Sequence, residues 1–125
     1  LVNVAPDWAS MAILRGRALV FFRSRGAEGE GTLADLVHQT AMYYEDRLSG
    51  AGFSRVMLSG ASTVGDQTPD SGALRRSLEE RLGTPVNLVD PRNAAALTDR
   101  IDGSPSLLDV LAPLVGLLLR DGEAA

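Results

Sequence analysis

The amino-terminal part of the chain alternates short apolar segments with turn-forming residues. Three apolar segments predict strands, over Leu1–Val4, Met11–Leu14 and Ala18–Phe22. Ala5-Pro6-Asp7 is typical of a turn, and Arg15-Gly16-Arg17 predicts a tight hairpin because glycine adopts positive φ without strain. The charged, glycine-rich stretch Arg23–Gly31 predicts a solvent-exposed loop.

Farther along the chain, apolar residues at three- and four-residue spacing predict helices. Thr32 is expected to cap the first helix, whose apolar stripe consists of Leu33, Leu36, Val37, Ala41, Tyr44 and Leu48. The second helix is expected to begin at Asp70 or Ser71 and to end at Gly83. Ser104-Pro105 opens a third helix that is expected to continue through Arg120, and residues 121–125 are expected to form a disordered tail.

Two more strands, Phe53–Leu58 and Val86–Val89, separate these helices. The predicted element order is therefore βββαβαβα. Sequential strands joined by tight turns pair antiparallel, whereas strands separated by a helix favour parallel crossovers. We therefore expect an α/β fold in which helices flank a mixed five-stranded sheet, formed by one domain over residues 1–120.

Composition limits the chemistry that the chain can perform. The 125 residues include no cysteine, one histidine (His38), and 12 basic residues, all of them arginine. A thiolate metal site, a cysteine nucleophile, a lysine Schiff base and a lysine-containing phosphate loop are thereby excluded. The net charge of −4 argues against a nucleic-acid partner, because phosphate neutralisation needs a basic surface.

The most apolar run, Leu107–Leu119, is shorter than the roughly 20 residues that span a bilayer, so we expect no direct membrane insertion. It predicts a helix that is apolar on nearly all sides, which one face of a sheet cannot cover. Two interpretations remain: deep burial in this domain, or contact with another domain or a second copy, giving a homodimer through this helix. The chain starts at Leu1 without a methionine, and we expect it to be a fragment of a longer protein.

Two segments could contact a ligand. Asp7-Trp8-Ala9-Ser10 is expected in the first hairpin turn, where Asp7 could hold a metal-bound water and Ser10 could touch a phosphate; the alternative is a turn initiated by Asp7. Ser59-Gly60-Ala61-Ser62 follows a strand, and its small residues would let a ligand approach the backbone. The alternative is a strand-to-helix connection that happens to have small side chains.

Several motifs, in order along the chain, resemble the C-terminal half of the actin-like ATPase superfamily, in particular the PilM family of type IV pilus assembly proteins. The matching segments are the hairpin Val4–Ile13, the strand Leu19–Arg23, Tyr43-Tyr44, the loop Val56–Ala61, Leu78–Val86 followed by Asp90-Pro91, and Gly116–Arg120. The resemblance covers most of the chain and is carried by the order and spacing of the motifs.

This resemblance implies a ribonuclease H-like domain, the second lobe of a two-lobed protein. It implies a nucleotide site at Asp7, Ser10, Gly60, Ala61 and Ser62. Two glycines of the family pattern are replaced by alanines, and Ala61 is expected to add a methyl where the nucleobase or ribose would lie. We therefore expect a vestigial site, with no cofactor in this chain and with ATP and Mg²⁺ confined to the intact protein if the site survives.

The resemblance further implies a cytoplasmic location, peripheral to the bacterial inner membrane, and partners among the pilus inner-membrane assembly proteins and the upstream lobe of the same protein. Our first hypothesis is accordingly a non-catalytic scaffold domain. The second is the C-terminal half of a nucleotide-binding ATPase. An unrelated ribonuclease H-like nuclease is disfavoured because only Asp7 is well placed among the carboxylates that such an enzyme needs.

Overall fold

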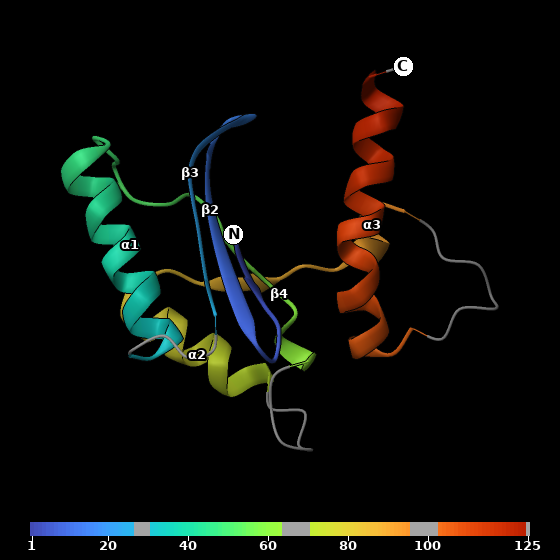
Figure 1. Cartoon of the computed structure of the whole chain (residues 1–125), viewed down its shortest axis with the longest axis horizontal. Helices are drawn as coiled ribbons and strands as arrows, with labels where there is room; N and C mark the ends of the chain where they lie inside the picture. The colour runs from blue at the N-terminus through green and yellow to red at the C-terminus, as the bar shows by residue number, and fades with distance from the viewer. Residues whose placement is uncertain (27–30, 64–70, 96–102, 125) are drawn as a thin grey trace.

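The computed structural model describes residues 1–26, 31–63, 71–95 and 103–124. The strands are β1 (Val2–Val4), β2 (Trp8–Arg15), β3 (Ala18–Gly26), β4 (Val56–Ser59) and β5 (Val86–Leu88). The helices are α1 (Leu33–Arg47), α2 (Ser71–Leu82) and α3 (Pro105–Ala124), with short 3-10 helices η1 (Ala61–Thr63) and η2 (Pro91–Asn93). Apart from these two 3-10 helices, the predicted order βββαβαβα is confirmed (Figure 1).

The five strands form one mixed sheet in the order β3-β2-β1-β4-β5. The first three strands pair antiparallel, and β4 pairs parallel with both β1 and β5. The predicted α/β architecture with a mixed five-stranded sheet is therefore confirmed. Because β1 and β4 are parallel neighbours, the segments that follow their carboxyl ends meet at one edge of the sheet.

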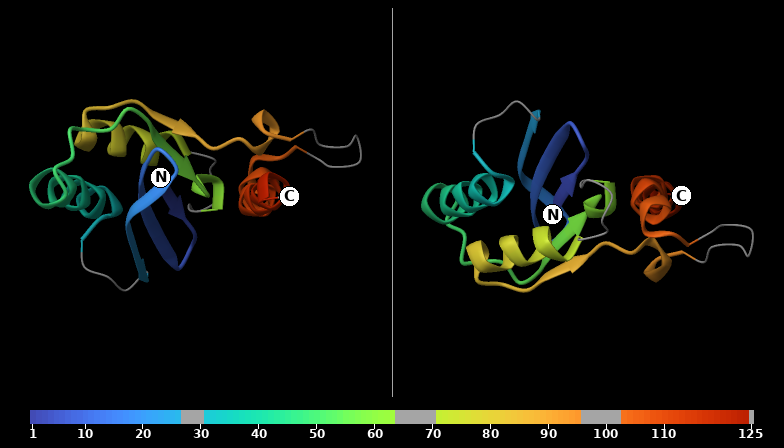
Figure 2. Two further views of the ribbon diagram at one scale, coloured as in Figure 1. Left: turned by 90° about the horizontal axis from the view of Figure 1, so that it is seen from above. Right: turned by 90° about the horizontal axis from the view of Figure 1, so that it is seen from below.

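Helices α1 and α2 cover one face of the sheet and enclose the core with it (Figure 2). The predicted stripe of α1 supplies Leu36 and Val37, and α2 supplies the fully buried Leu78. The sheet contributes Val2, Val4, Met11, Val56, Leu58 and Val86. Alternate residues of β1 point to this core, which leaves Asn3 on the opposite face of the sheet.

Local end signals explain where the helices begin and end. The Thr32 hydroxyl caps α1 by accepting from the Asp35 amide at 3.1 Å, and it donates to the Asp35 carboxylate at 2.8 Å. The hydrogen bond from Thr32 is the main cause of a lowered pKa of Asp35. At the end of α2, Gly83 has φ of 63° and donates to the Glu79 carbonyl at 2.8 Å. Asp70, the alternative cap of α2, lies outside the described residues.

The structure corrects several predicted boundaries. The fourth strand starts at Val56 rather than Phe53 and ends at Ser59. The second strand starts at Trp8 rather than Met11, and the third continues through the charged segment to Gly26, because Trp8–Met11 pairs with Arg23–Gly26 along the hairpin. The region 23–26 is therefore strand rather than loop. The last helix extends beyond Arg120 to Ala124, so the expected disordered tail is wrong for residues 121–124. Gly122 weakens a helix but, unlike proline, retains its hydrogen-bonding N–H.

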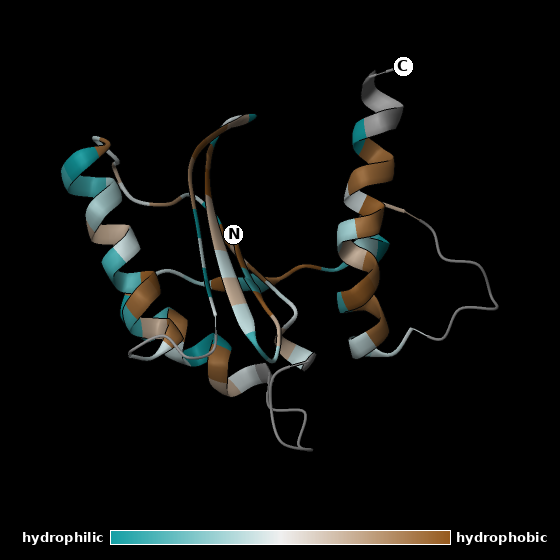
Figure 3. Cartoon of the chain, viewed as in Figure 1, coloured by the Kyte–Doolittle hydropathy of each residue, from teal (hydrophilic) through white to brown (hydrophobic). Residues whose placement is uncertain are grey.

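Helix α3 stands on the other side of the sheet from α1 and α2, and its main contacts are with η1 and η2 (Figures 1 and 2). Leu108 of this helix is buried. Val110, Leu114 and Leu117 each expose more than half of their surface, and Leu118 exposes 73%. Figure 3 shows apolar residues along most of this helix. Of the two interpretations of this helix, deep burial is therefore excluded.

Candidate functional site

The two segments predicted to contact a ligand begin at the carboxyl ends of the neighbouring strands β1 and β4. The turn after β1 is closed by a hydrogen bond from the Ala5 amide to the Trp8 carbonyl at 2.9 Å. Gly60 follows β4 with φ of 81°, and a side chain there would overlap the carbonyl oxygen of Val4. Glycine is therefore required at this position, both by its backbone conformation and by the close approach of β1.

Asp7 and Ser10 are separated more than the sequence predicts. Asp7 is exposed in the turn, as expected. Ser10 is not in the turn: it lies within β2, opposite Asn3 of β1 and Ser24 of β3. The strand begins earlier than its apolar residues indicate, and this moves Ser10 into the antiparallel pairing. The expectation of one compact turn carrying both side chains is thus wrong.

The strand register instead creates a row of small polar side chains across four strands. Ser24, Ser10, Asn3 and Ser59 lie next to one another in that order, on β3, β2, β1 and β4. Ser59 is buried and Asn3 is half-buried. The sequence contains one signal for Asn3, a polar residue between the two buried valines of β1, but the row itself depends on long-range register.

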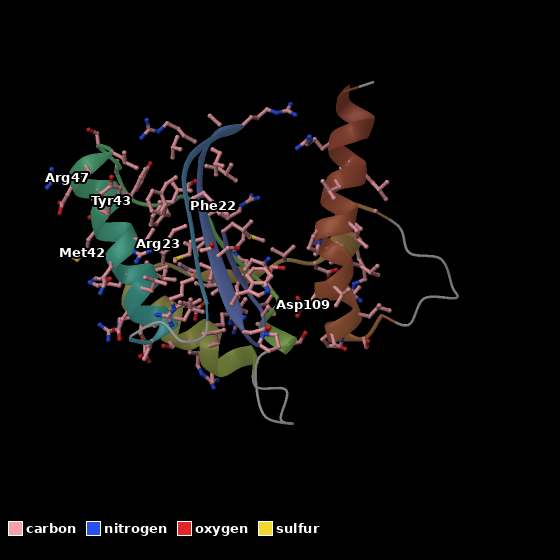
Figure 4. All side chains as sticks on the ribbon, viewed as in Figure 1. Phe22, Arg23, Met42, Tyr43, Arg47 and Asp109 are labelled. Atoms are coloured by element: carbon pink, nitrogen blue, oxygen red, sulfur yellow. The ribbon has the colours of Figure 1, made fainter. Side chains whose placement is uncertain are left out.

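The loop after β4 is held by a carboxylate from the last helix. Asp109 of α3 accepts the amide N–H of Gly60 on Oδ1 at 3.0 Å and the amide N–H of Ser62 on Oδ2 at 3.1 Å. The Ser62 hydroxyl also donates to Oδ2. Figure 4 shows Asp109 on the side of α3 that faces this loop. We call this set of three hydrogen bonds the Asp109 clamp.

The clamp has the chemistry of an anion site. Two backbone amides and one hydroxyl converge on a single carboxylate, and such hydrogen bonds to an ionised acceptor are stronger than neutral ones. The same donors would suit a phosphate oxygen. In this structure the chain's own Asp109 takes these donors, so a ligand anion would have to displace it.

The sequence does not identify Asp109 as a site residue, because there it only interrupts an apolar run. A single acid among apolar residues in a helix is a signal for a specific polar contact, but it does not identify the partner. Ala61 also differs from expectation: its side chain is only 4% exposed and belongs to the core. Its methyl therefore does not occupy the ligand-facing side of the loop.

Asp90, two residues after β5, caps η2. Its side chain accepts the amide N–H of Arg92 at 2.9 Å and pairs with the Arg92 guanidinium, with its Oδ2 2.7 Å from Nη2. These hydrogen bonds from Arg92 lower the pKa of Asp90. Among the described residues, no three side chains of histidine, cysteine, aspartate or glutamate are grouped so that they could hold a metal ion.

The chain matches no model of a known protein family, and no curated protein matches it. Across the described ranges, none of the helices has the length and apolar character that a membrane crossing requires.

Replacing Asp109 tests the clamp. We expect Asp109→Ala to lower the free energy of unfolding by about 1–3 kcal/mol, because the donors of Gly60 and Ser62 lose their acceptor. Alanine favours a helix more than aspartate does, so a loss cannot arise from helix propensity. Chemical denaturation measures the stability, and limited proteolysis should show earlier cleavage around α3.

The matched control is Asp46→Ala, which removes an exposed aspartate from α1. This control should change the free energy of unfolding by no more than a few tenths of a kcal/mol. Equal and small effects of the two substitutions would contradict the clamp.

Proposed function

We propose that this chain is a non-catalytic interaction domain, the C-terminal lobe of a PilM-like scaffold from the actin-like ATPase superfamily. The mixed sheet, the element order and the parallel pairing of β1 with β4 agree with the ribonuclease H-like fold that the sequence resemblance implies. The proposed location is cytoplasmic, at the inner face of a bacterial inner membrane. The proposed partners are pilus inner-membrane assembly proteins and an upstream lobe.

The Asp109 clamp carries this proposal. In the nucleotide-site hypothesis, Gly60 and Ser62 would contact the nucleotide, but their amides are hydrogen-bonded to Asp109. Because the Asp109 carboxylate occupies these donors, the loop attaches α3 to the sheet instead of facing a ligand. The loop then serves to position a helix rather than a substrate.

The exposed side of α3 supports an interaction role. Val110, Leu114, Leu117 and Leu118 follow one another at positions i, i+4, i+7 and i+8, and hence lie along one side of α3. All four are more than half exposed. A contiguous apolar stripe of this kind on a helix is typical of a protein contact. We propose that a second copy of the chain can cover it, as in the homodimer considered from the sequence.

A second candidate function is a nucleotide-binding half of an ATPase. The observation that favours it is the position of the Asp7 turn and the Gly60–Ser62 loop at the same edge of the sheet. A nucleotide phosphate would then replace the Asp109 carboxylate on the same donors. This candidate function requires Asp109 of α3 to release the Gly60 and Ser62 donors when nucleotide binds.

Self-association tests the interaction role. We expect the chain to associate in a concentration-dependent manner and Leu118→Arg to shift it to a monomer, because a buried unpaired guanidinium opposes an apolar contact. Light scattering over a range of protein concentrations measures this. Leu19→Arg on β3 is the matched control, since Leu19 is also exposed, at 58%, and lies away from α3. If the unsubstituted chain is a monomer at every concentration, this would contradict the proposed self-association.

Titration calorimetry separates the two candidate functions. The scaffold proposal predicts no ATP binding with a Kd below about 1 mM, in this chain or in the longer two-lobed protein that the resemblance implies. The ATPase candidate predicts tighter binding that is lost in Asp7→Ala. Binding of that strength with that sensitivity would overturn the scaffold proposal.

A further inference from the structure

Strand β3 forms one edge of the sheet. The sheet order places β2 on one side of β3, and no strand among the described residues pairs with its other side. The pairing of β3 with β2 is regular from Phe21 to Gly26, beyond the irregularity near Leu19. At the rise of a β-strand this stretch is roughly 20 Å long. We call the outer side of Phe21–Gly26 the β3 edge.

The hydrogen bonds of β2 show which residues of β3 direct backbone groups to this edge. In an antiparallel sheet, successive residues direct their N–H and C=O groups alternately to the two neighbouring strands. Ala12 of β2 forms both of its backbone hydrogen bonds with Leu1, on the β1 side. Its partner in β3, Phe22, is therefore in a pair without hydrogen bonds. Phe22, and likewise Ser24, thus direct N–H and C=O to the β3 edge.

The side chains along the β3 edge are divided between the two faces of the sheet. Arg23 pairs with the buried Met11 and hence lies on the face that α1 and α2 cover. Phe21 lies on the same face, and its ring centre is 5.6 Å from that of Tyr43 in α1. Phe22 lies on the opposite face and exposes 61% of its surface. The edge is therefore polar and aromatic beside α1, and apolar at Phe22 on the other face.

Two arginines lie next to the aromatic pair of Phe21 and Tyr43. Arg23 follows Phe21 by two residues on the same face of β3, and Arg47 follows Tyr43 by one helical turn. Both arginines are exposed, and within the part of the chain that the structure describes neither forms an ion pair. Figure 4 shows both on the side of the molecule formed by α1 and β3, away from Asp109.

The positive charge of this surface contrasts with the net charge of −4 of the chain. The acidic residues of the same part of α1 are Glu45 and Asp46, and both are exposed. At 3.6 residues per turn, they lie about 200° and about 100° from Arg47 around the helix axis. They are thus on other sides of α1 than Arg47. Arg23 and Arg47 are therefore available to an acidic partner.

We propose that the β3 edge binds an extended segment of a partner protein in which acidic residues alternate with apolar ones. The backbone of this segment would pair with Phe22 and Ser24, as in β-strand addition. Its acidic side chains would lie on the face of Arg23 and Arg47, and its apolar side chains would lie beside Phe22 on the other face. This proposal depends neither on the scaffold function nor on the exposed side of α3.

A second copy of the chain fits this edge less well than an acidic segment does. Two β3 strands related by a two-fold axis would have to match outward-directed residues with one another. A register centred on Arg23 places the two Arg23 side chains opposite each other, and a register centred on Ser24 places Arg23 opposite Arg25. Like charges directly opposite each other destabilise a strand pair, and charged residues on edge strands oppose edge-to-edge pairing.

Two synthetic peptides with blocked ends test the charge of the occupant. The first alternates glutamate with valine over about seven residues, and the second has lysine in place of each glutamate. We expect the first to bind with a Kd below about 1 mM, and the second to bind at least about tenfold more weakly, because its lysines would face Arg23 and Arg47. Fluorescence anisotropy of the labelled peptides measures both affinities. Equal affinities would overturn the proposal.

Charge reversal on the protein places the site. Arg23→Glu combined with Arg47→Glu should weaken binding of the glutamate peptide at least about tenfold and strengthen binding of the lysine peptide. The matched control is Arg75→Glu combined with Arg120→Glu, which changes the net charge equally at exposed arginines of α2 and α3 and should leave both affinities unchanged. All four residues are exposed, so both variants should fold, as circular dichroism would show. Equal effects of the two double variants would overturn the proposal.

N-methylation of the glutamate peptide tests the backbone pairing. Alternate residues of an extended strand direct their N–H groups to the same side, so methylation of only the valines or only the glutamates removes one set of donors. We expect one methylated peptide to lose binding and the other to retain it. Equal effects of the two methylations would overturn strand addition.

Amide chemical shifts of the protein locate the peptide. The glutamate peptide should shift the Phe22 and Ser24 amides and should slow hydrogen exchange of the Phe22 amide at least about tenfold, because the added strand accepts this N–H. An unchanged exchange rate at saturating peptide would overturn the proposal. Shifts of these two amides that depend on protein concentration without peptide would assign the edge to a second copy, and would overturn it as well.

Discussion

The Asp109 clamp determines how helix α3 is attached to the rest of the fold. One carboxylate accepts two backbone amides and a hydroxyl from the loop after β4. The loop itself is fixed by Gly60, whose backbone conformation and contact with Val4 exclude a side chain. The clamp thereby connects α3 to the central strands of the sheet through β4, although α3 makes its main contacts with η1 and η2.

This mode of attachment explains why an apolar helix remains exposed. Asp109 and Leu108 are in the first part of α3, and the clamp holds this part near the carboxyl edge of the sheet. The following turns carry Leu114, Leu117 and Leu118 away from the core, past Pro113. A helix held at one end leaves its other side exposed, and this is the side that the proposed partner would cover. This exposed side of α3 is the observation that supports the proposed interaction role.

The sequence predicts the elements of this fold well because their signals are local. Glycine and proline mark the turns. Thr32 caps α1 as expected, and the apolar stripe of α1 packs against the sheet. Strand lengths were predicted less well. The third strand extends through charged residues because its length depends on pairing with β2, which its own composition does not encode.

The candidate site was only partly predictable for the same reason. The loop Gly60–Ser62 was identified from its small residues, but its partner Asp109 is 49 residues from Gly60. Nothing in local spacing connects the two. Likewise, the polar row that includes Asn3 and Ser10 arises from strand register. Ser10 lies in β2 rather than in the turn because β2 pairs along its whole length. The small residues of the loop are thus a local signal, whereas its hydrogen-bond partner depends on the tertiary fold.

Native-state hydrogen exchange at the Gly60 and Ser62 amides tests the central claim most directly. Both amides donate to Asp109, so we expect them to exchange much more slowly than unstructured amides, and to lose this protection in Asp109→Ala. Exchange of both amides at the rate of an unstructured chain, in the unsubstituted protein, would contradict the account.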